Sequence, residues 1–121
     1  MARIDSHKDL IVWQKSMELA VAVYALSSTF PKSEDYRLTS QLTRAAVSVP
    51  ANIAEGHARS TRKDYANFLA ISRGSLAETE TFVILAQRLG YATQTAIADV
   101  LARIDEVGRM LVTLRKRLQG G

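Results

Sequence analysis

The chain has 121 residues, of which 47% are hydrophobic and 23% are charged, so its composition excludes intrinsic disorder and supplies the core of one domain spanning residues 1–121. The absence of cysteine excludes a disulfide framework and a thiolate metal site, and it is typical of proteins in a reducing compartment. A net charge of +4 permits an acidic or nucleic-acid partner without requiring one.

The first helical pattern runs from about Leu10 to Ser28. One apolar stripe is Leu10, Trp13, Met17, Ala20 and Tyr24, and a neighbouring stripe is Val12, Leu19, Val23 and Leu26. An apolar sector wider than one seam indicates burial on two sides, either by two helices of the same subunit or by one helix and another subunit. The helix is expected to end before Pro31, because proline and the residue before it disfavour helix.

The second helix is expected from Asp35 or Tyr36 to His57, and it contains a proline. Its apolar stripe is Leu38, Leu42, Ala45, Val49, Ile53 and Gly56. Pro50 has no N–H to donate to the carbonyl of Ala46, so we expect the helix to bend there, at a cost of about 3 kcal/mol in an isolated helix. Ser48 or Asn52 is expected to satisfy a freed backbone group. The small residues Ala45, Ala46, Ala51, Ala54 and Gly56 would let another helix approach closely.

Two more helices follow. Thr61 is a typical N-cap with Asp64 in the first turn, and it predicts a third helix that runs to Leu89 and stops at Gly90. Thr93 or Thr95 is expected to open the fourth helix, which ends at the final glycines. Because short connections make sequential helices antiparallel, the sequence predicts an all-α protein, an up-down-up-down antiparallel four-helix bundle whose second helix is bent at Pro50.

The second and third helices are expected to form a hairpin centred near residue 60. Its register would face Asn52 with Phe68, Ser48 with Ser72 and Arg44 with Leu76. Arg44 then lies within reach of Glu78, and two interpretations stay open: an interhelical ion pair that fixes the register, or two separately solvated residues.

Three further positions on these helices are candidates for structural roles. Gly74 costs about 1 kcal/mol relative to alanine inside a helix. We expect it to permit close backbone approach, either to the second helix or across a subunit interface. Asn52 and Glu55 are expected to contact backbone or side-chain groups near the bend.

The sequence holds no catalytic or metal-binding constellation. A di-iron bundle needs Glu-x-x-His pairs on two helices, and neither His7 nor His57 stands in that arrangement. Glu55 and His57 would point about 200° apart on a helix, which excludes a shared ligand face. No phosphate-binding loop, nucleophile elbow or HExxH motif occurs. We therefore expect no enzyme, no cofactor and no small-molecule substrate.

Basic residues gather at one end of the predicted bundle, where the N-terminus, the second loop and the C-terminus meet. The basic set is Arg3, Lys8, Arg59, Arg62, Lys63, Arg115, Lys116 and Arg117, and the acidic set is Asp5, Asp9, Glu55 and Asp64. If several copies of the chain formed a ring, each copy would repeat this basic end, and the assembly would attract phosphates in a salt-dependent way. The alternative is that the basic residues of the last turn only stabilise the helix dipole.

The run from Gln41 to Tyr91 resembles the four-helix bundle family named for 23S rRNA intervening-sequence proteins. The matching motifs are Ala45 to Gly56, Arg59 with Ser60, Phe68-Leu69, Gly74-Ser75-Leu76 with Glu78, and Leu89-Gly90-Tyr91. This resemblance implies a small cytoplasmic bacterial protein that forms a ring-shaped homopentamer. The chain is also similar to accessory proteins of diversity-generating retroelements, which form basic pentamers that contact nucleic acid and a reverse transcriptase.

Two functions are consistent with these patterns. The first is a non-enzymatic, homo-oligomeric scaffold or interaction protein, with assembly or structural roles for Trp13, Arg44, Pro50, Asn52, Glu55, Gly56, Gly74 and Glu78. The second is an accessory protein that binds structured RNA or RNA/DNA through Arg59, Arg62, Lys63, Arg115, Lys116 and Arg117. The first ten residues are too charged for a signal peptide, and no apolar run approaches about 20 residues, so we expect a cytoplasmic protein without a membrane partner.

Overall fold

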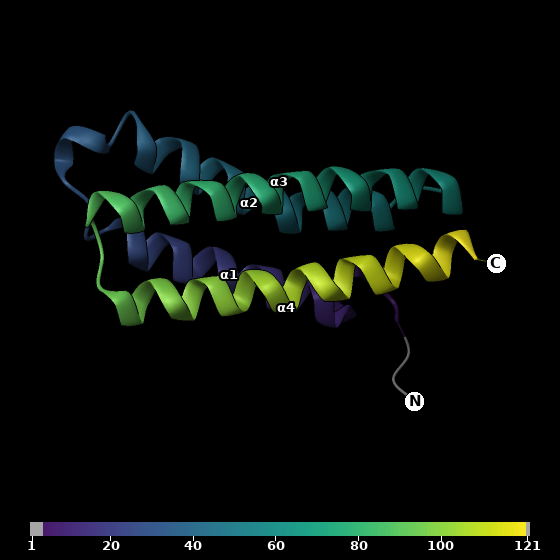
Figure 1. Cartoon of the computed structure of the whole chain (residues 1–121). Coiled ribbons are helices and arrows are strands. Elements are labelled where there is room, and N and C mark those ends of the chain that lie inside the picture. The colour runs from purple at the N-terminus through teal and green to yellow at the C-terminus, as the bar shows by residue number, and fades with distance from the viewer. Residues whose placement is uncertain (1–3, 121) are drawn as a thin grey trace.

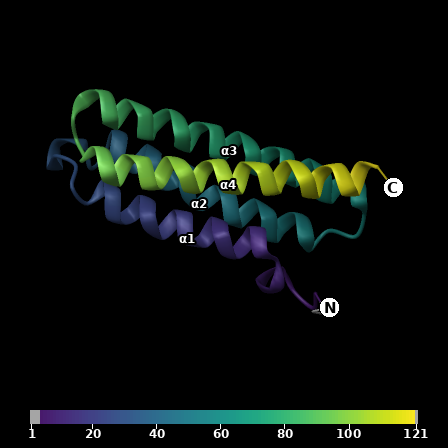
Figure 2. The same cartoon turned by 60° about the horizontal axis from the view of Figure 1, so that its bottom comes forward.

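A computed structural model describes residues 4–120, and four long helices account for most of them (Figure 1). The helices are α1 (Ile11–Ser27), α2 (Leu38–His57), α3 (Arg62–Leu89) and α4 (Gln94–Gln119), and two short 3₁₀ turns, η1 (His7–Asp9) and η2 (Lys32–Glu34), precede α1 and α2. Each helix packs against its neighbours in the chain, and α4 packs against α1 to close the bundle (Figure 2). The predicted antiparallel four-helix bundle is therefore confirmed.

The helix ends follow the predicted capping residues. The Thr61 hydroxyl accepts a hydrogen bond from the Asp64 N–H at 3.1 Å, and the Thr93 hydroxyl accepts one from the Ala96 N–H at 3.2 Å. Gly90 ends α3 with a φ of 73°, a left-handed conformation that a side chain would disfavour. Thr93 rather than Thr95 is the cap of α4.

The second helix starts at Leu38, later than the predicted Asp35 or Tyr36. The reason is Glu34, which ends η2 and is buried. Its carboxylate accepts hydrogen bonds from the Leu38 N–H at 3.3 Å and from the Tyr91 hydroxyl at 2.8 Å. Glu34 therefore ties the start of α2 to the loop between α3 and α4.

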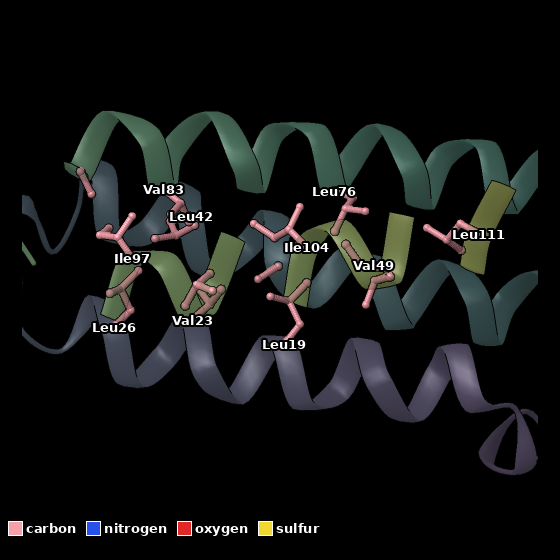
Figure 3. Packing of buried hydrophobic residues seen from close by; sticks show 14 of the residues in the cluster. Leu19, Val23, Leu26, Leu42, Val49, Leu76, Val83, Ile97, Ile104 and Leu111 are labelled. Carbon is pink, nitrogen blue, oxygen red and sulfur yellow. The ribbon is translucent and has the colours of Figure 1, made fainter. Parts of the chain in front are cut away.

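The core lies along the axis of the bundle and receives side chains from all four helices. In Figure 3, Leu19, Leu42, Leu76 and Ile104 extend from different helices into the space between them. The fully buried large side chains are Leu19, Leu42, Ile53, Leu69, Ile97 and Leu111. This core uses the Val12, Leu19, Val23 and Leu26 stripe of α1.

The other predicted stripe of α1 is only partly buried within the subunit. Met17 is 41% exposed and Tyr24 is 56% exposed, whereas Trp13 is half-buried and Ala20 is buried. The two neighbouring helices of the same subunit, α2 and α4, therefore do not cover the whole apolar sector of α1, because Met17 and Tyr24 stay exposed.

Pro50 is buried, and α2 continues through it without interruption. The side-chain N–H of Asn52 donates to the Ser48 carbonyl at 2.8 Å, one turn back. Asn52 therefore contacts a backbone group near the proline, but the carbonyl that Pro50 frees is that of Ala46, and neither Ser48 nor Asn52 donates a side-chain hydrogen bond to it. The bend at Pro50 stays a prediction.

Candidate functional site

An open groove between α1 and α2 is lined by apolar side chains. The groove has a volume of about 460 Å³ and is lined by Trp13, Met17, Ala20, Val21, Tyr24, Val47, Pro50, Ala51 and Ala54, none of which is charged. Val21 is 68% exposed at its rim. Contiguous apolar surface of this kind marks interaction sites on proteins. The groove is therefore the first candidate for a functional surface.

The shape of the groove follows from the small residues of α2. Val47, Ala51 and Ala54 are three or four residues apart and share the side of α2 that adjoins α1. Pro50, Ala51 and Ala54 have short side chains, so the space above them is left empty. His7 of η1 contacts Trp13 edge-on, with ring centroids 5.1 Å apart, and so holds one end of the groove.

A second hollow, of about 660 Å³, lies between α3 and α4, but its lining is mixed. It includes the charged residues Arg73, Glu80, Asp105 and Arg109. Arg109 forms an ion pair with Asp105 inside this hollow. We favour the smaller groove as an interaction surface because it is the apolar one.

The outer side of α3 also exposes apolar side chains. Ile71 is 52% exposed and Leu85 is 43% exposed. Gly74 lies between them on the same side, and a Cβ atom built there would meet nothing within 4 Å. The expectation that Gly74 permits close approach to the second helix is therefore wrong, because α2 does not reach it. Its alternative role, at a subunit interface, stays a prediction.

Gly56 is the glycine that permits close approach of α2 and α3. A Cβ atom there would lie 2.8 Å from the Cβ atom of Phe68 and 3.2 Å from the Tyr65 carbonyl oxygen. Further along the seam, the buried Ser72 hydroxyl donates to the Val49 carbonyl at 2.8 Å. These contacts agree with the predicted hairpin register to within a few residues.

Arg44 and Glu78 do not form the ion pair that the register suggested. Both are exposed, and neither takes part in any of the ion pairs found among residues 4–120. The reason is orientation, since the seam beside them is occupied by small buried side chains such as Ser72, while Arg44 and Glu78 face outward. Glu55 does form an ion pair, with Arg59 at 3.7 Å, but that pair is exposed and joins the last turn of α2 only to the loop that follows it.

The predicted basic end is brought together by contacts between α3 and α4 (Figure 1). The Arg62 guanidinium donates to the Arg117 carbonyl at 2.9 Å, and the Arg115 guanidinium donates to the Ala66 carbonyl at 3.2 Å. These two arginines therefore join the last turns of α4 to the first turns of α3.

The remaining basic residues of this end differ in whether their side chains have a partner within the protein. Arg59 lies over the Phe68 ring, 4.7 Å from its centroid, and pairs with Glu55. Lys63, Lys116 and Arg117 are exposed, and their side chains make no ion pair within residues 4–120. Arg3, which belonged to the predicted basic set, lies outside the described residues.

Among residues 4–120, the shifted pKa values outside the basic end belong to the link between η2 and the α3–α4 loop. The hydrogen bond from Tyr91 lowers the pKa of Glu34, and that same bond raises the pKa of Tyr91. At the basic end, burial raises the pKa of Tyr65. Within residues 4–120 no group of three or more His, Cys, Asp or Glu side chains is placed to hold a metal ion.

Sequence reasoning missed several residues that shape these surfaces. Val21 and Val47 line the groove, yet the predicted stripes did not include them. Val21 follows Met17 by four residues, a spacing that was visible in the sequence, but only the packing of α1 on α2 shows that both remain uncovered. Glu34 and Tyr91, which are 57 residues apart, carried no local signal of their contact.

Comparison with known proteins covers most of the bundle. The family model described as 23S rRNA-intervening sequence protein matches residues 8–113. A crystal structure of a protein of unknown function from the S23 ribosomal protein family of Bacteroides thetaiotaomicron is similar, with a TM-score of 0.79 and 27% sequence identity over 88% of this chain and 99% of that chain. A search of curated proteins found no match.

The matched range contains the whole groove and the outer side of α3, and it ends before Arg115. Among the helices within residues 4–120, none combines the length and the apolar character that crossing a membrane requires.

Proposed function

This chain belongs to the family of 23S rRNA-intervening sequence proteins, and we propose that it works as a homo-oligomeric helical scaffold without enzymatic activity. The proposed assembly is a cytoplasmic bacterial homopentamer, as the resemblance to this family implies. The observation that carries the proposal is the open groove between α1 and α2, with Val21 68% and Tyr24 56% exposed in a single subunit.

The energetic reason is the burial of apolar surface. Each square ångström of apolar area removed from water is worth about 25 cal/mol, so covering large side chains such as Met17, Val21 and Tyr24 favours association. A single subunit leaves them in water. The scaffold would then present the remaining faces of each subunit to a protein partner.

The mass of the assembly tests this proposal. Native mass spectrometry or light scattering at micromolar concentration should give one species of about five times the 13.3 kDa subunit mass. A compact species of 13.3 kDa at that concentration would contradict it.

A second candidate function, binding of structured RNA or RNA/DNA, is favoured by the basic end. Lys63, Lys116 and Arg117 are exposed side chains near one another in the fold, since Arg62 bonds directly to the Arg117 backbone. Cations without a protein partner are available to phosphates, whereas Arg62 and Arg115 already hold backbone carbonyls.

A filter-binding experiment with a structured RNA hairpin across a salt series tests this function. Replacing Lys63, Lys116 and Arg117 together with alanine should weaken binding. It should also reduce the slope of log K against log salt by about 2 to 3, because each lost phosphate contact contributes about 0.9 to that slope. The matched control replaces Lys32, Arg73 and Arg88, which removes the same charge elsewhere. Absence of binding at low salt, or equal loss in both variants, would refute a specific role for the basic end.

A further inference from the structure

Two uncovered surfaces that carry apolar side chains lie on different helices of the same subunit. One is the α1/α2 groove, and the other is the outer stripe of α3, which we define as Ile71, Gly74, Glu78 and Leu85. Resting on the proposed self-association, we infer that the outer stripe of one copy occupies the α1/α2 groove of the next copy. Each copy would then use two different surfaces, one on each side.

The outer stripe has the pattern of a helix face that packs on another helix. Its residues are three, four and seven apart, so they lie on one side of α3. Gly74 is exposed, and the space around its missing Cβ atom is empty. An interior helix glycine that nothing in its own subunit approaches leaves room for a second copy.

The charges of the two surfaces are complementary. Arg44 precedes Val47 by one turn of α2, at the border of the groove, and Glu78 lies in the middle of the stripe. Each is exposed and takes part in no ion pair among residues 4–120. Docking of the stripe in the groove would let Glu78 of one copy pair with Arg44 of the next, which would set the register of the contact.

A contact between unlike surfaces also determines the form of the assembly. When the stripe of a copy is used, its groove is still free to receive another copy, so such contacts continue until a ring closes. A contact between two identical grooves would instead stop at a dimer. The two surfaces of this chain therefore favour a ring.

Mixing two defective variants tests the inference directly. Val21→Glu places a carboxylate in the groove, and Ile71→Glu places one in the stripe; both residues are more than half exposed, so each variant should fold. Each variant alone should run at the 13.3 kDa subunit mass in native mass spectrometry. An equimolar mixture should form dimers of one copy of each, because one intact stripe meets one intact groove while the other two surfaces repel each other. Thr113→Glu, on the exposed side of α4, is the matched control and should keep the wild-type mass.

The outcomes separate the inference from the proposed function. If both single variants keep the wild-type mass, or if the mixture stays monomeric, the stripe-in-groove contact is wrong while self-association through other surfaces stands. If the wild-type chain is itself monomeric, both the proposed function and this inference fall. Circular dichroism of each variant should show the same helical spectrum as the wild type. A fall to the subunit mass then reports loss of the contact and not unfolding.

Discussion

The two sides of α2 make opposite use of small residues. Toward α3, Gly56 brings the helices so close that a Cβ atom would lie 2.8 Å from Phe68, and Ser72 bonds directly to a backbone carbonyl of α2. Toward α1, Ala51 and Ala54 leave a groove open. Small side chains therefore do not by themselves indicate a tight contact within a subunit, because the distance to the next helix decides whether the space they leave is filled.

The largest expected effect tests the closed side. Gly56→Ala should destabilise the subunit by about 1 to 3 kcal/mol, because the added Cβ atom overpacks the seam against Phe68. The free energy of unfolding should be measured by chemical denaturation, in the Val21→Glu background so that assembly does not contribute.

Gly74→Ala is the matched control for that substitution. The space around Gly74 is empty, so the change should stabilise the subunit by up to about 1 kcal/mol, the helix propensity difference. Equal effects of the two substitutions would contradict the contrast between a closed seam and an open face.

Pro50→Ala acts on the open side. It restores an N–H donor to the helix and removes the proline ring from the groove, so we expect a straighter α2 and an altered assembly, visible as a change of mass in native mass spectrometry. An unchanged oligomeric mass would show that the groove does not depend on the proline.

The charges beside the groove and in the stripe sharpen the comparison further. Arg44→Glu and Glu78→Arg should each weaken assembly about tenfold by placing like charges together, and the double variant should recover most of that loss. The dissociation constant should be followed by dilution in light scattering. Because the two residues are not paired within one subunit, recovery would report a contact between copies.

The smallest effect concerns the start of α2, where Glu34 accepts a hydrogen bond from the Leu38 N–H. The pKa of Glu34 is lowered from its ordinary value of 4.5 by Tyr91, so this carboxylate contributes stability that is present above pH 4.5 and is lost as the pH falls through its folded value. Tyr91→Phe removes the hydroxyl, raises the pKa of Glu34 toward the ordinary value and should reduce the loss of stability between pH 5 and pH 3. Thermal melts at the two pH values measure it, and an unchanged difference would contradict the link.

Much of the fold was predictable from local signals. The caps Thr61 and Thr93 and the stop at Gly90 act on the nearest backbone groups, so their effect is readable in sequence. The start of α2 was predicted too early, because it depends on the buried carboxylate of Glu34 and its contact with Tyr91, 57 residues away.

The candidate site was predictable only in part. The basic end was expected at the right place, yet Arg62 and Arg115 bond to backbone carbonyls, a use that charge patterns do not reveal. For Arg44 and Glu78 the hairpin register left open an ion pair or two solvated residues, because it sets the height of two residues along their helices but not the direction in which their side chains point.

Periodicity and capping alone determined four antiparallel helices and the apolar residues available for burial, because these signals act within one or two turns of a helix. Tertiary packing decided which of those residues are buried. Of the two apolar stripes of α1, the bundle covers Leu19 and Val23 and leaves Met17 and Tyr24 in water, since a helix packed against two neighbours in a bundle has only one side enclosed. The uncovered stripe is therefore a property of the folded subunit, and it is the surface on which self-association can act.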